Sequence, residues 1–195
     1  MLAVRDDPGW VEAELASGGL WCPSCGGSLG PWGWARPRML RVSGGQPRRL
    51  RPRRSCCRVC RATHVLLPTS ALLRRCAAVE VIGAALLAKQ AGLGHRRVAA
   101  RLGVPEATVR GWLRRFTARA ETLRAAATVW AYRLDVQLGA LQPRGSPYAD
   151  ALEALGAAAA AAVRRFGPPC SPWHVVAALT GGLMLAPGRL PRPGA

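Results

Sequence analysis

From residue 77 onward, apolar residues recur at three- and four-residue steps, the pattern of helices that bury one face. In the first such segment Val79, Ile82 and Leu86 share a face, and glycines at positions 92 and 94 end it. No glycine or proline lies between Gly111 and Gly139, so the helix over this stretch is expected to continue for several turns. The pattern therefore predicts helices over residues 77–91, 95–102, 106 onward, 148–166 and 173–179.

The long helix carries an apolar stripe that needs a packing partner. The stripe consists of Leu123, Ala127, Trp130, Leu134 and Leu141. Two partners fit it: the core of the same chain, which we favour, or a second copy of the chain in a homodimer.

The first third of the chain has the pattern of short strands. Trp32 to Val42 and Arg48 to Arg54 are expected to pair across the turn Ser43-Gly44-Gly45-Gln46, and Thr63 to Leu67 to add a third strand. Prolines at positions 37, 47 and 52 interrupt this region. Because proline cannot donate to a strand ladder, part of the segment is expected to be irregular or mobile.

Residues 95–115 have the pattern of a helix-turn-helix. Ala99 is small where two helices must approach closely, Gly103 follows four residues later where the turn needs a positive φ, and Pro105 suits the first position of the next helix. An ordinary two-helix hairpin is the alternative, but this register favours DNA binding. The residues expected to form the buried seam are Val98, Leu102, Val104, Val109 and Trp112.

The same spacing predicts which side chains face outward. Arg110 and Arg114 are four residues apart, so they share the face opposite Val109 and Trp112, where an arginine can pair with guanine in the major groove. The residues expected to read bases are Glu106, Ala107, Arg110 and Arg114. Those expected to contact phosphates, near the helix starts, are His95, Arg96 and Thr108.

Charge points to the same kind of partner. The chain has 28 Lys and Arg against 10 Asp and Glu, a formal net charge of +18, and twelve arginines but no acid lie between Arg36 and Arg75. Such an excess favours nucleic acid or an anionic membrane as the partner. Further phosphate contacts, without base discrimination, are expected from Arg48, Arg49, Arg51, Arg53 and Arg54.

Two Cys-x-x-Cys turns predict a zinc site. Cys22 and Cys25 are separated by 31 residues from Cys57 and Cys60. Each turn places two thiolates on one face of a tight knuckle, and two knuckles complete a tetrahedral S₄ site for Zn²⁺. The alternative is a set of reduced cysteines without metal.

Two neighbouring residues leave the ligand set open. Cys56 adjoins Cys57, although only Cys57 has the knuckle spacing to Cys60. His64 is able to replace one thiolate, but it falls on the expected third strand.

A zinc ribbon followed directly by a helix-turn-helix resembles the DNA-binding front end of insertion-sequence transposases and their small accessory proteins. The chain looks more like a family of unknown function from high-GC bacteria. This resemblance implies zinc binding and DNA binding, often in mobile elements, and no known activity. The long insert between the cysteine pairs departs from the minimal transposase ribbon. The segments that carry the closer resemblance are Cys22-Pro-Ser-Cys25-Gly-Gly, the run from Cys57 to Pro68, Val79 to Leu87, Gly94 to Pro105, and Trp173-His with Leu179-Thr-Gly-Gly182.

Several function classes are not expected. Strand transfer with two metal ions needs clustered carboxylates, and the only late group is Asp135, Asp150 and Glu153; any catalytic subunit is therefore expected to be a separate chain. No nucleotide-binding fingerprint or secretory signal is visible, and the apolar segments are too short to span a bilayer. A cytoplasmic protein that is not an enzyme is expected.

The expected fold is mainly α with a small β zinc ribbon, in which a three-helix, homeodomain-like helix-turn-helix unit is followed by additional helices. The expected function is sequence-specific binding of double-stranded DNA, as a transcriptional regulator or a transposition accessory factor. The alternative is a zinc-stabilised adaptor that binds RNA or an acidic protein partner. The expected segments are 1–19 (N-terminal segment), 20–68 (zinc ribbon), 77–141 (helix-turn-helix with extended helix), 148–186 (C-terminal helices) and 187–195 (disordered tail).

Overall fold

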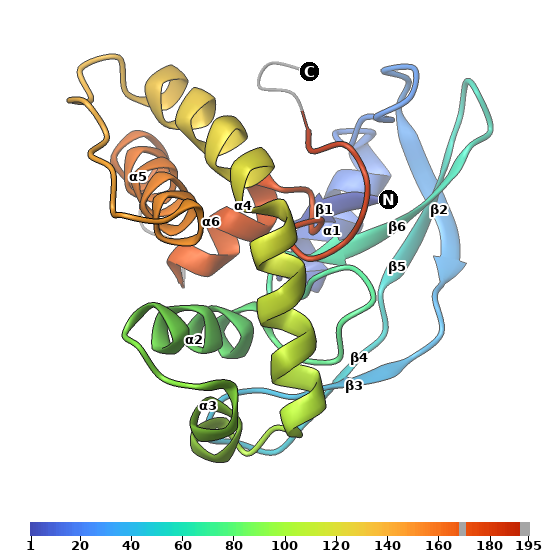
Figure 1. Cartoon of the computed structure of the whole chain (residues 1–195). Coiled ribbons are helices and arrows are strands. Elements are labelled where there is room, and N and C mark those ends of the chain that lie inside the picture. Colours follow the sequence, from blue (N-terminus) through green and yellow to red (C-terminus); the bar gives the residue numbers. More distant parts are fainter. Residues whose placement is uncertain (168–170, 192–195) are drawn as a thin grey trace.

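Strands gather at one side of the molecule and helices at the other (Figure 1). The computed structural model describes residues 1–167 and 171–191. Their elements are β1 (Leu2–Val4), α1 (Pro8–Ser17), β2 (Leu29–Trp34), β3 (Arg38–Leu40), β4 (Arg48–Leu50), β5 (Arg53–Cys57), β6 (Thr63–Pro68), α2 (Val79–Gln90), α3 (His95–Leu102), α4 (Glu106–Leu134), α5 (Pro147–Phe166) and α6 (Pro172–Leu179).

The main sheet has the strand order β1-β6-β5-β2, and β3 and β4 form a second, two-stranded sheet. β5 pairs antiparallel with β2 and with β6. The predicted pairing across residues 43–46 is present, because β2–β5 and β3–β4 are successive parts of one long hairpin, joined by a hydrogen bond from Ala35 N to Pro52 O of 2.8 Å. The strands are broken at residues 35–37 and 51–52, beside two of the prolines.

The N-terminal residues belong to the sheet rather than to a separate segment. β1 pairs parallel with β6, with Leu2 opposite Leu66. Asp7 caps α1 by accepting a hydrogen bond from Trp10 N at 3.0 Å. Val11 and Leu15 of α1 are buried in one small cluster with Leu29 and Leu66. Residues of the expected N-terminal segment therefore form part of the main sheet and of its small core.

The β3–β4 pair packs on the helices. Leu40 and Leu50 are buried in the large cluster that contains α2 to α6. The backbone of Arg41 donates to Cys76 O at 2.9 Å and accepts from Ala78 N at 2.8 Å. The insert between the cysteine pairs is thus fixed against the helical part, where an irregular or mobile stretch was expected.

Helices α2, α3 and α4 form the predicted three-helix unit. Gly103 ends α3 with φ +60°, the left-handed conformation that the turn needs. Ala99 is buried at the helix crossing, and four of the five predicted seam residues are buried, with Leu102 half-buried. α4 begins at Glu106, directly after Pro105.

α4 and α5 lie against each other along the top of the helical part (Figure 1). Leu123, Ala127 and Trp130 of the apolar stripe are buried in the chain's own core, together with alanines of α5 such as Ala154 and Ala158. Small side chains on α5 allow the two helices to approach closely. The stripe therefore packs against the core of the same chain, as expected from the sequence.

Residues 187–191 of the expected tail pack against the protein. Leu190 is buried in the large cluster, and Arg119 donates to Gly188 O at 3.2 Å. The rest of that expected tail, 192–195, lies outside the described residues. Among the described residues no helix has the length and apolarity needed to cross a membrane.

Candidate metal centre and nucleic-acid interface

The fold brings the two cysteine pairs together. Cys22 and Cys25 lie in the turn before β2, and Cys57 and Cys60 lie at the end of β5 and in the turn that follows. All four sulfur atoms lie within 4.8 Å of one another, with Sγ–Sγ distances of 3.7 Å between Cys22 and Cys60 and 3.5 Å between Cys25 and Cys57. Ligands about 2.3 Å from a tetrahedral metal are about 3.8 Å apart. The four cysteines therefore lie close enough to bind one metal ion.

The knuckles are shaped by glycine and by backbone donors. Gly26 has φ +71°. A Cβ atom on Gly27 would lie 2.7 Å from the Val59 side chain, so glycine lets the two turns meet. The N–H groups of Val59 and Cys60 each donate to Cys57 Sγ at 3.4 Å. Such donors stabilise a thiolate over a thiol.

The sulfur atoms influence one another's ionisation. Burial acts to raise the pKa of Cys22, but hydrogen bonds from the Ser24 and Cys25 backbone and from His64 outweigh it and lower the pKa to about 5. The pKa of Cys60 shifts in the opposite direction. The Ala62 N–H acts to lower the pKa of Cys60, but hydrogen bonds shared with the other three cysteines raise it to about 12. Four thiolates at one place need a cation beside them.

Cys56 and His64 occupy different positions around the cluster. Cys56 Sγ lies 3.4 Å from Arg61 O and is outside the group of four. His64, on β6, is buried with its Nε2 atom 3.3 Å from Cys22 Sγ and its Nδ1 atom 3.2 Å from the amino group of Met1. His64 is therefore placed to orient Cys22 from outside the group of four, the position of an outer-shell partner.

The outward face of the helix-turn-helix is open to solvent. Ala107, Arg110 and Arg114 are exposed on α4, and Thr108 is exposed in its first turn. Glu106 is also exposed, and its carboxylate lies 3.6 Å from Arg96 on α3. This ion pair joins the starts of the two helices.

A shallow hollow lies beside these residues, between the α2–α3 loop and α4. Its lining includes Lys89, His95, Arg110, Arg114 and Thr117, with no acid among the lining residues. His95 is half-buried at the start of α3. His95, a predicted phosphate contact, thus lies beside Arg110 and Arg114, two of the predicted base-reading residues.

The five arginines predicted as uniform phosphate contacts have unequal surroundings. Arg48 pairs with Asp6 at 2.9 Å, and Arg53 pairs with Glu12 at 2.7 Å while stacking 4.8 Å from the Trp34 ring. The remaining three have no ion pair among the described residues; they are Arg49, Arg51 and Arg54. The acids that hold Arg48 and Arg53 come from residues 1–19, which the sequence did not place beside the strands.

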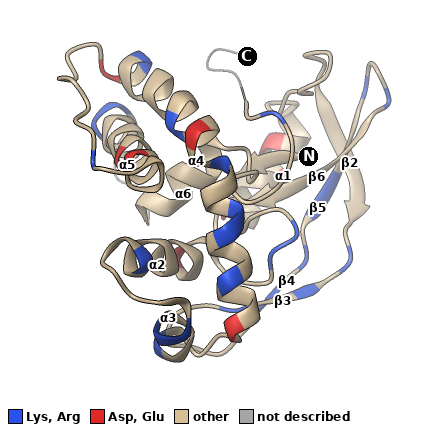
Figure 2. Ribbon diagram, in the orientation of Figure 1, with Lys and Arg blue, Asp and Glu red and all other residues tan. Residues whose placement is uncertain are grey.

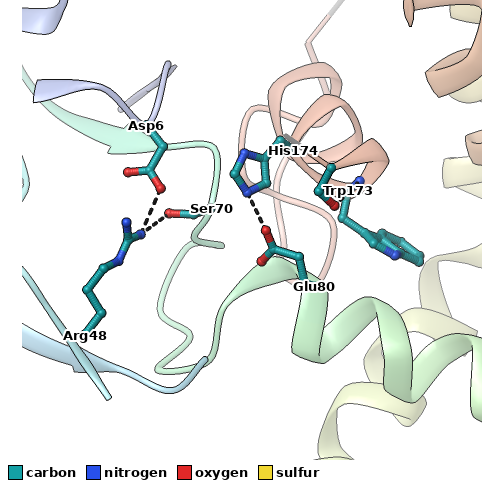
Figure 3. A network of polar contacts seen from close by, with 7 residues as sticks. Asp6, Arg48, Ser70, Glu80, Trp173 and His174 are labelled. Carbon is teal, nitrogen blue, oxygen red and sulfur yellow. Dashed lines mark hydrogen bonds and ion pairs between the residues drawn. The ribbon is translucent and has the colours of Figure 1, made fainter. Parts of the chain in front are cut away.

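A second polar network joins the strands to the helices (Figure 3). Arg48 bridges Asp6 and Ser70, and close by, His174 of α6 lies 2.5 Å from Glu80 of α2. Burial acts to raise the pKa of Glu80, but the hydrogen bond with His174, a hydrogen bond from its own backbone and the charge of His174 together outweigh burial and lower the pKa. Sequence reasoning assigned no role to Glu80 or His174, although both lie in segments that carry the family resemblance.

The late carboxylates are each held by a cation or a backbone donor. Asp135 pairs with Arg164 at 2.7 Å, Glu153 pairs with Arg144 at 2.9 Å, and Asp150 accepts from Arg144 N at 2.5 Å. Among the described residues, the four cysteines form the one group of three or more potential ligands that lie at metal-binding separation. The three acids are not gathered into such a group.

Comparison with protein families supports the helix-turn-helix. A homeodomain-like domain model matches residues 73–124, which contain α2, α3 and the first part of α4. No curated protein and no solved structure matches the chain. The chain therefore contains a homeodomain-like helix-turn-helix domain, a type of domain that indicates DNA binding.

Proposed function

We propose that this protein is a sequence-specific DNA-binding protein without catalytic activity of its own. The observation that carries the proposal is the coincidence of the homeodomain-like match with an exposed basic face on α4. In this proposal α4 lies in the major groove, where Arg110 and Arg114 read bases. Glu106 and Ala107 tune the adjoining base. The phosphate contacts come from His95, Arg96 and Thr108.

The decisive experiment is a selection of bound sequences from a random duplex library with the full chain, followed by binding to the selected duplex and to random DNA. Arg110→Ala is expected to weaken the selected site by about 1–3 kcal/mol, roughly 5- to 150-fold, with much less effect on random DNA. Arg124→Ala is the matched control, because Arg124 lies on the same helix but pairs with Glu121 at 2.5 Å. Equal weakening of both duplexes by Arg110→Ala contradicts base reading.

The cellular role that we propose is transcriptional regulation or assistance to transposition, with any strand transfer performed by a separate catalytic chain. Asp135 and Glu153 are ion-paired, Asp150 accepts from the Arg144 backbone, and the three do not form a group at metal-binding separation, which supports this. Supercoiled DNA incubated with the chain and Mg²⁺ or Mn²⁺ is expected to stay intact. Cleavage that Asp135→Ala, Asp150→Ala or Glu153→Ala abolishes contradicts the non-catalytic assignment.

We also propose that Zn²⁺ is the metal held by Cys22, Cys25, Cys57 and Cys60. An all-thiolate set with tetrahedral spacing favours zinc among common cellular ions. Elemental analysis of purified protein is expected to give about one Zn²⁺ per chain. A Cys22→Ser/Cys57→Ser variant is expected to lose it, whereas Cys56→Ser is expected to keep it.

The second candidate function is an adaptor that binds RNA or an acidic protein, which the net charge of +18 favours. A phosphate-only interface needs charge but no base-reading face. Competition between the selected duplex, random duplex and RNA separates the two. Equal competition by all three supports the adaptor.

A further inference from the structure

Four arginines near the helix-turn-helix donate to backbone carbonyls and have no carboxylate partner among the described residues. Arg41 donates to Gly103 O, Arg75 to Leu185 O at 3.0 Å, Arg115 to Gly111 O at 2.9 Å and Arg119 to Gly188 O at 3.2 Å. None of these arginines, nor Arg38, has an ion pair within residues 1–167 and 171–191. We call this set the arginine surface: Arg38, Arg41, Arg75, Arg115 and Arg119.

Members of the arginine surface come from three elements that lie together. Arg38 is on β3, Arg75 is in the β6–α2 loop, and Arg115 is on α4. Burial lowers the pKa of Arg75, and the positive charge of Arg115 lowers it further. Arg38 and Arg75 both interact electrostatically with Cys76. Figure 2 shows basic segments on α4, on the β6–α2 loop beside it and along the β3–β4 hairpin.

Three of these guanidinium groups are partly buried. The Nε atoms of Arg38, Arg75 and Arg119 are buried with no hydrogen-bond partner in the described part of the chain. Bringing like charges together and removing water from them costs free energy, which a nearby anion offsets. Arg49, Arg51 and Arg54 also have no ion pair among the described residues. The feature that distinguishes Arg38, Arg75 and Arg119 is therefore the burial of an Nε atom without a partner, in addition to the missing carboxylate.

The periodicity of α4 places the arginine surface beside the proposed base-reading residues. At 3.6 residues per turn, Ala107, Arg114 and Ala118 lie close to one line along the middle of the solvent-facing side, with Gly111 beside it. Arg110 lies on one side of this line, whereas Arg115 and Arg119 lie on the other. A major groove has phosphates on both of its walls, so arginines on both sides of a closely seated helix match it.

The hairpin reaches the same end of the helix-turn-helix. Arg41 contacts the turn between α3 and α4 through Gly103 O, and its backbone pairs with residues 76–78. In homeodomains the segment before the first helix is a free arm that contacts DNA. Here that segment cannot be free, because Ala71, Leu72 and Ala77 are buried. The anchored hairpin instead places Arg41 against the turn between α3 and α4.

We propose that the arginine surface binds the phosphodiester backbone of the same DNA duplex that α4 reads. This inference rests on the proposed function and extends the interface to β3, the β6–α2 loop and the far side of α4. Binding through this surface adds affinity that depends on salt and not on base sequence.

The test compares two triple variants of the full chain that remove the same charge. Arg41→Gln/Arg75→Gln/Arg115→Gln changes the surface, and Arg124→Gln/Arg144→Gln/Arg164→Gln changes arginines that have carboxylate partners. Binding to the selected duplex and to random duplex is measured by fluorescence anisotropy across a salt series. The surface variant is expected to lower the slope of log affinity against log salt by about two to three units and to weaken both duplexes by about tenfold or more. The control variant is expected to keep the wild-type slope.

Three further measurements make the result decisive. Thermal melting shows whether each variant is folded. If the Gln triple variant of the arginine surface unfolds, the single variant Arg41→Gln replaces it, because Arg41 is exposed. Arg41→Lys/Arg75→Lys/Arg115→Lys is expected to keep the slope, because counterion release depends on charge. If the wild type binds no duplex, the proposed function fails. If the wild type binds and both Gln triple variants behave alike, the arginine surface is overturned while the proposed function stands.

Discussion

The sheet part and the helical part of this chain have cores of very different kinds. The sheet part buries a small cluster that includes Val4, Leu15, Leu29 and Leu66 and two of the four clustered cysteines. The helical part buries a continuous cluster through α2, α3, α4, α5 and α6, with Phe116 and Trp130 among its members. A small apolar cluster stabilises a fold only weakly, so small domains commonly add a metal or disulfides. From this difference we predict that the sheet part depends on a metal ion bound by the four cysteines and that the helical part depends on packing.

The boundary between the two cores does not follow the order of the chain. Leu40 and Leu50 lie between the cysteine pairs in sequence but are buried with the helices. The polar network of Figure 3 crosses the same boundary. The β3–β4 hairpin therefore lies between the two cysteine pairs in sequence but belongs to the helical part by packing.

Metal removal is expected to give the largest effect and tests the comparison directly. Structural zinc supplies on the order of 10 kcal/mol to small metal-dependent folds. Chelation, or Cys57→Ser, is expected to remove hydrogen-exchange protection from β2, β5 and β6 while most helical circular dichroism remains. Equal loss of protection in α4 and α5 would mean that the two cores unfold together.

Leu40→Ala is expected to give the second largest effect. Leu40 is fully buried against the helices, so truncation removes packing and leaves a cavity, at a cost of about 2–5 kcal/mol. The loss is expected in urea unfolding followed by helical circular dichroism, with metal content unchanged. Met39→Ala is the matched control, because Met39 is 52% exposed on the same strand, and its effect is expected to be within about 0.5 kcal/mol. Loss of metal in Leu40→Ala would assign the hairpin to the ribbon core instead.

Features that depend on short spacings could be predicted from the sequence. The two Cys-x-x-Cys turns, the Ala99–Gly103 register and the helical stripe on α4 each need only neighbouring residues to be recognised. The structure brings the four cysteines within 4.8 Å and buries most of the seam. Local geometry determines these features, so the sequence carries a readable signal for them.

Features that depend on distant partners could not be predicted. β1 has only three residues and is a strand because it pairs with β6. Asp6 and Glu12 partner Arg48 and Arg53, about 40 positions away in the chain. The arginines between Arg36 and Arg75 looked uniform in sequence, but the fold gives some of them carboxylates and leaves others without. Pairing of this kind is set by topology, for which the pattern of single residues has no signal.

Gly83→Ala tests a close contact inside the helical core that could not be predicted from the sequence either. A Cβ atom on Gly83 would lie 2.1 Å from the Trp173 ring, so α2 and α6 must separate to accept it. Alanine gains about 1 kcal/mol in helix propensity, but overpacking costs about 1–3 kcal/mol. Net destabilisation by about 1 kcal/mol or more is expected in denaturant unfolding.

Gly156→Ala on α5 is the matched control for Gly83→Ala. No atom lies within 4 Å of its ideal Cβ position, and the residue is exposed. The substitution is expected to stabilise the protein by about 0.5–1 kcal/mol through helix propensity alone. If Gly83→Ala also stabilises the protein, the Trp173 ring moves aside at little cost in free energy, and the packing of α2 on α6 is loose.

The smallest expected effect concerns the Glu80–His174 pair at the boundary between the cores. The folded-state pKa of Glu80 is lowered because the hydrogen bond and charge of His174, together with a backbone hydrogen bond, outweigh the effect of burial. A lowered carboxyl pKa stabilises the fold above the unfolded value of about 4.3, and this contribution is lost as the pH falls through the folded value. Because the Glu80 side chain is 36% exposed, solvent screening limits the contribution to about 1 kcal/mol.

Glu80→Gln is therefore expected to destabilise the protein at pH 7 and to have little effect near pH 3, measured by urea unfolding at both values. A double-mutant cycle with His174→Gln isolates the pair from the separate cost of each change. A coupling energy that vanishes at low pH supports an ionised Glu80 that links α2 to α6. A coupling energy that is the same at both pH values would mean that the contact is a neutral hydrogen bond. In that case the carboxylate charge of Glu80 contributes nothing to the coupling between α2 and α6.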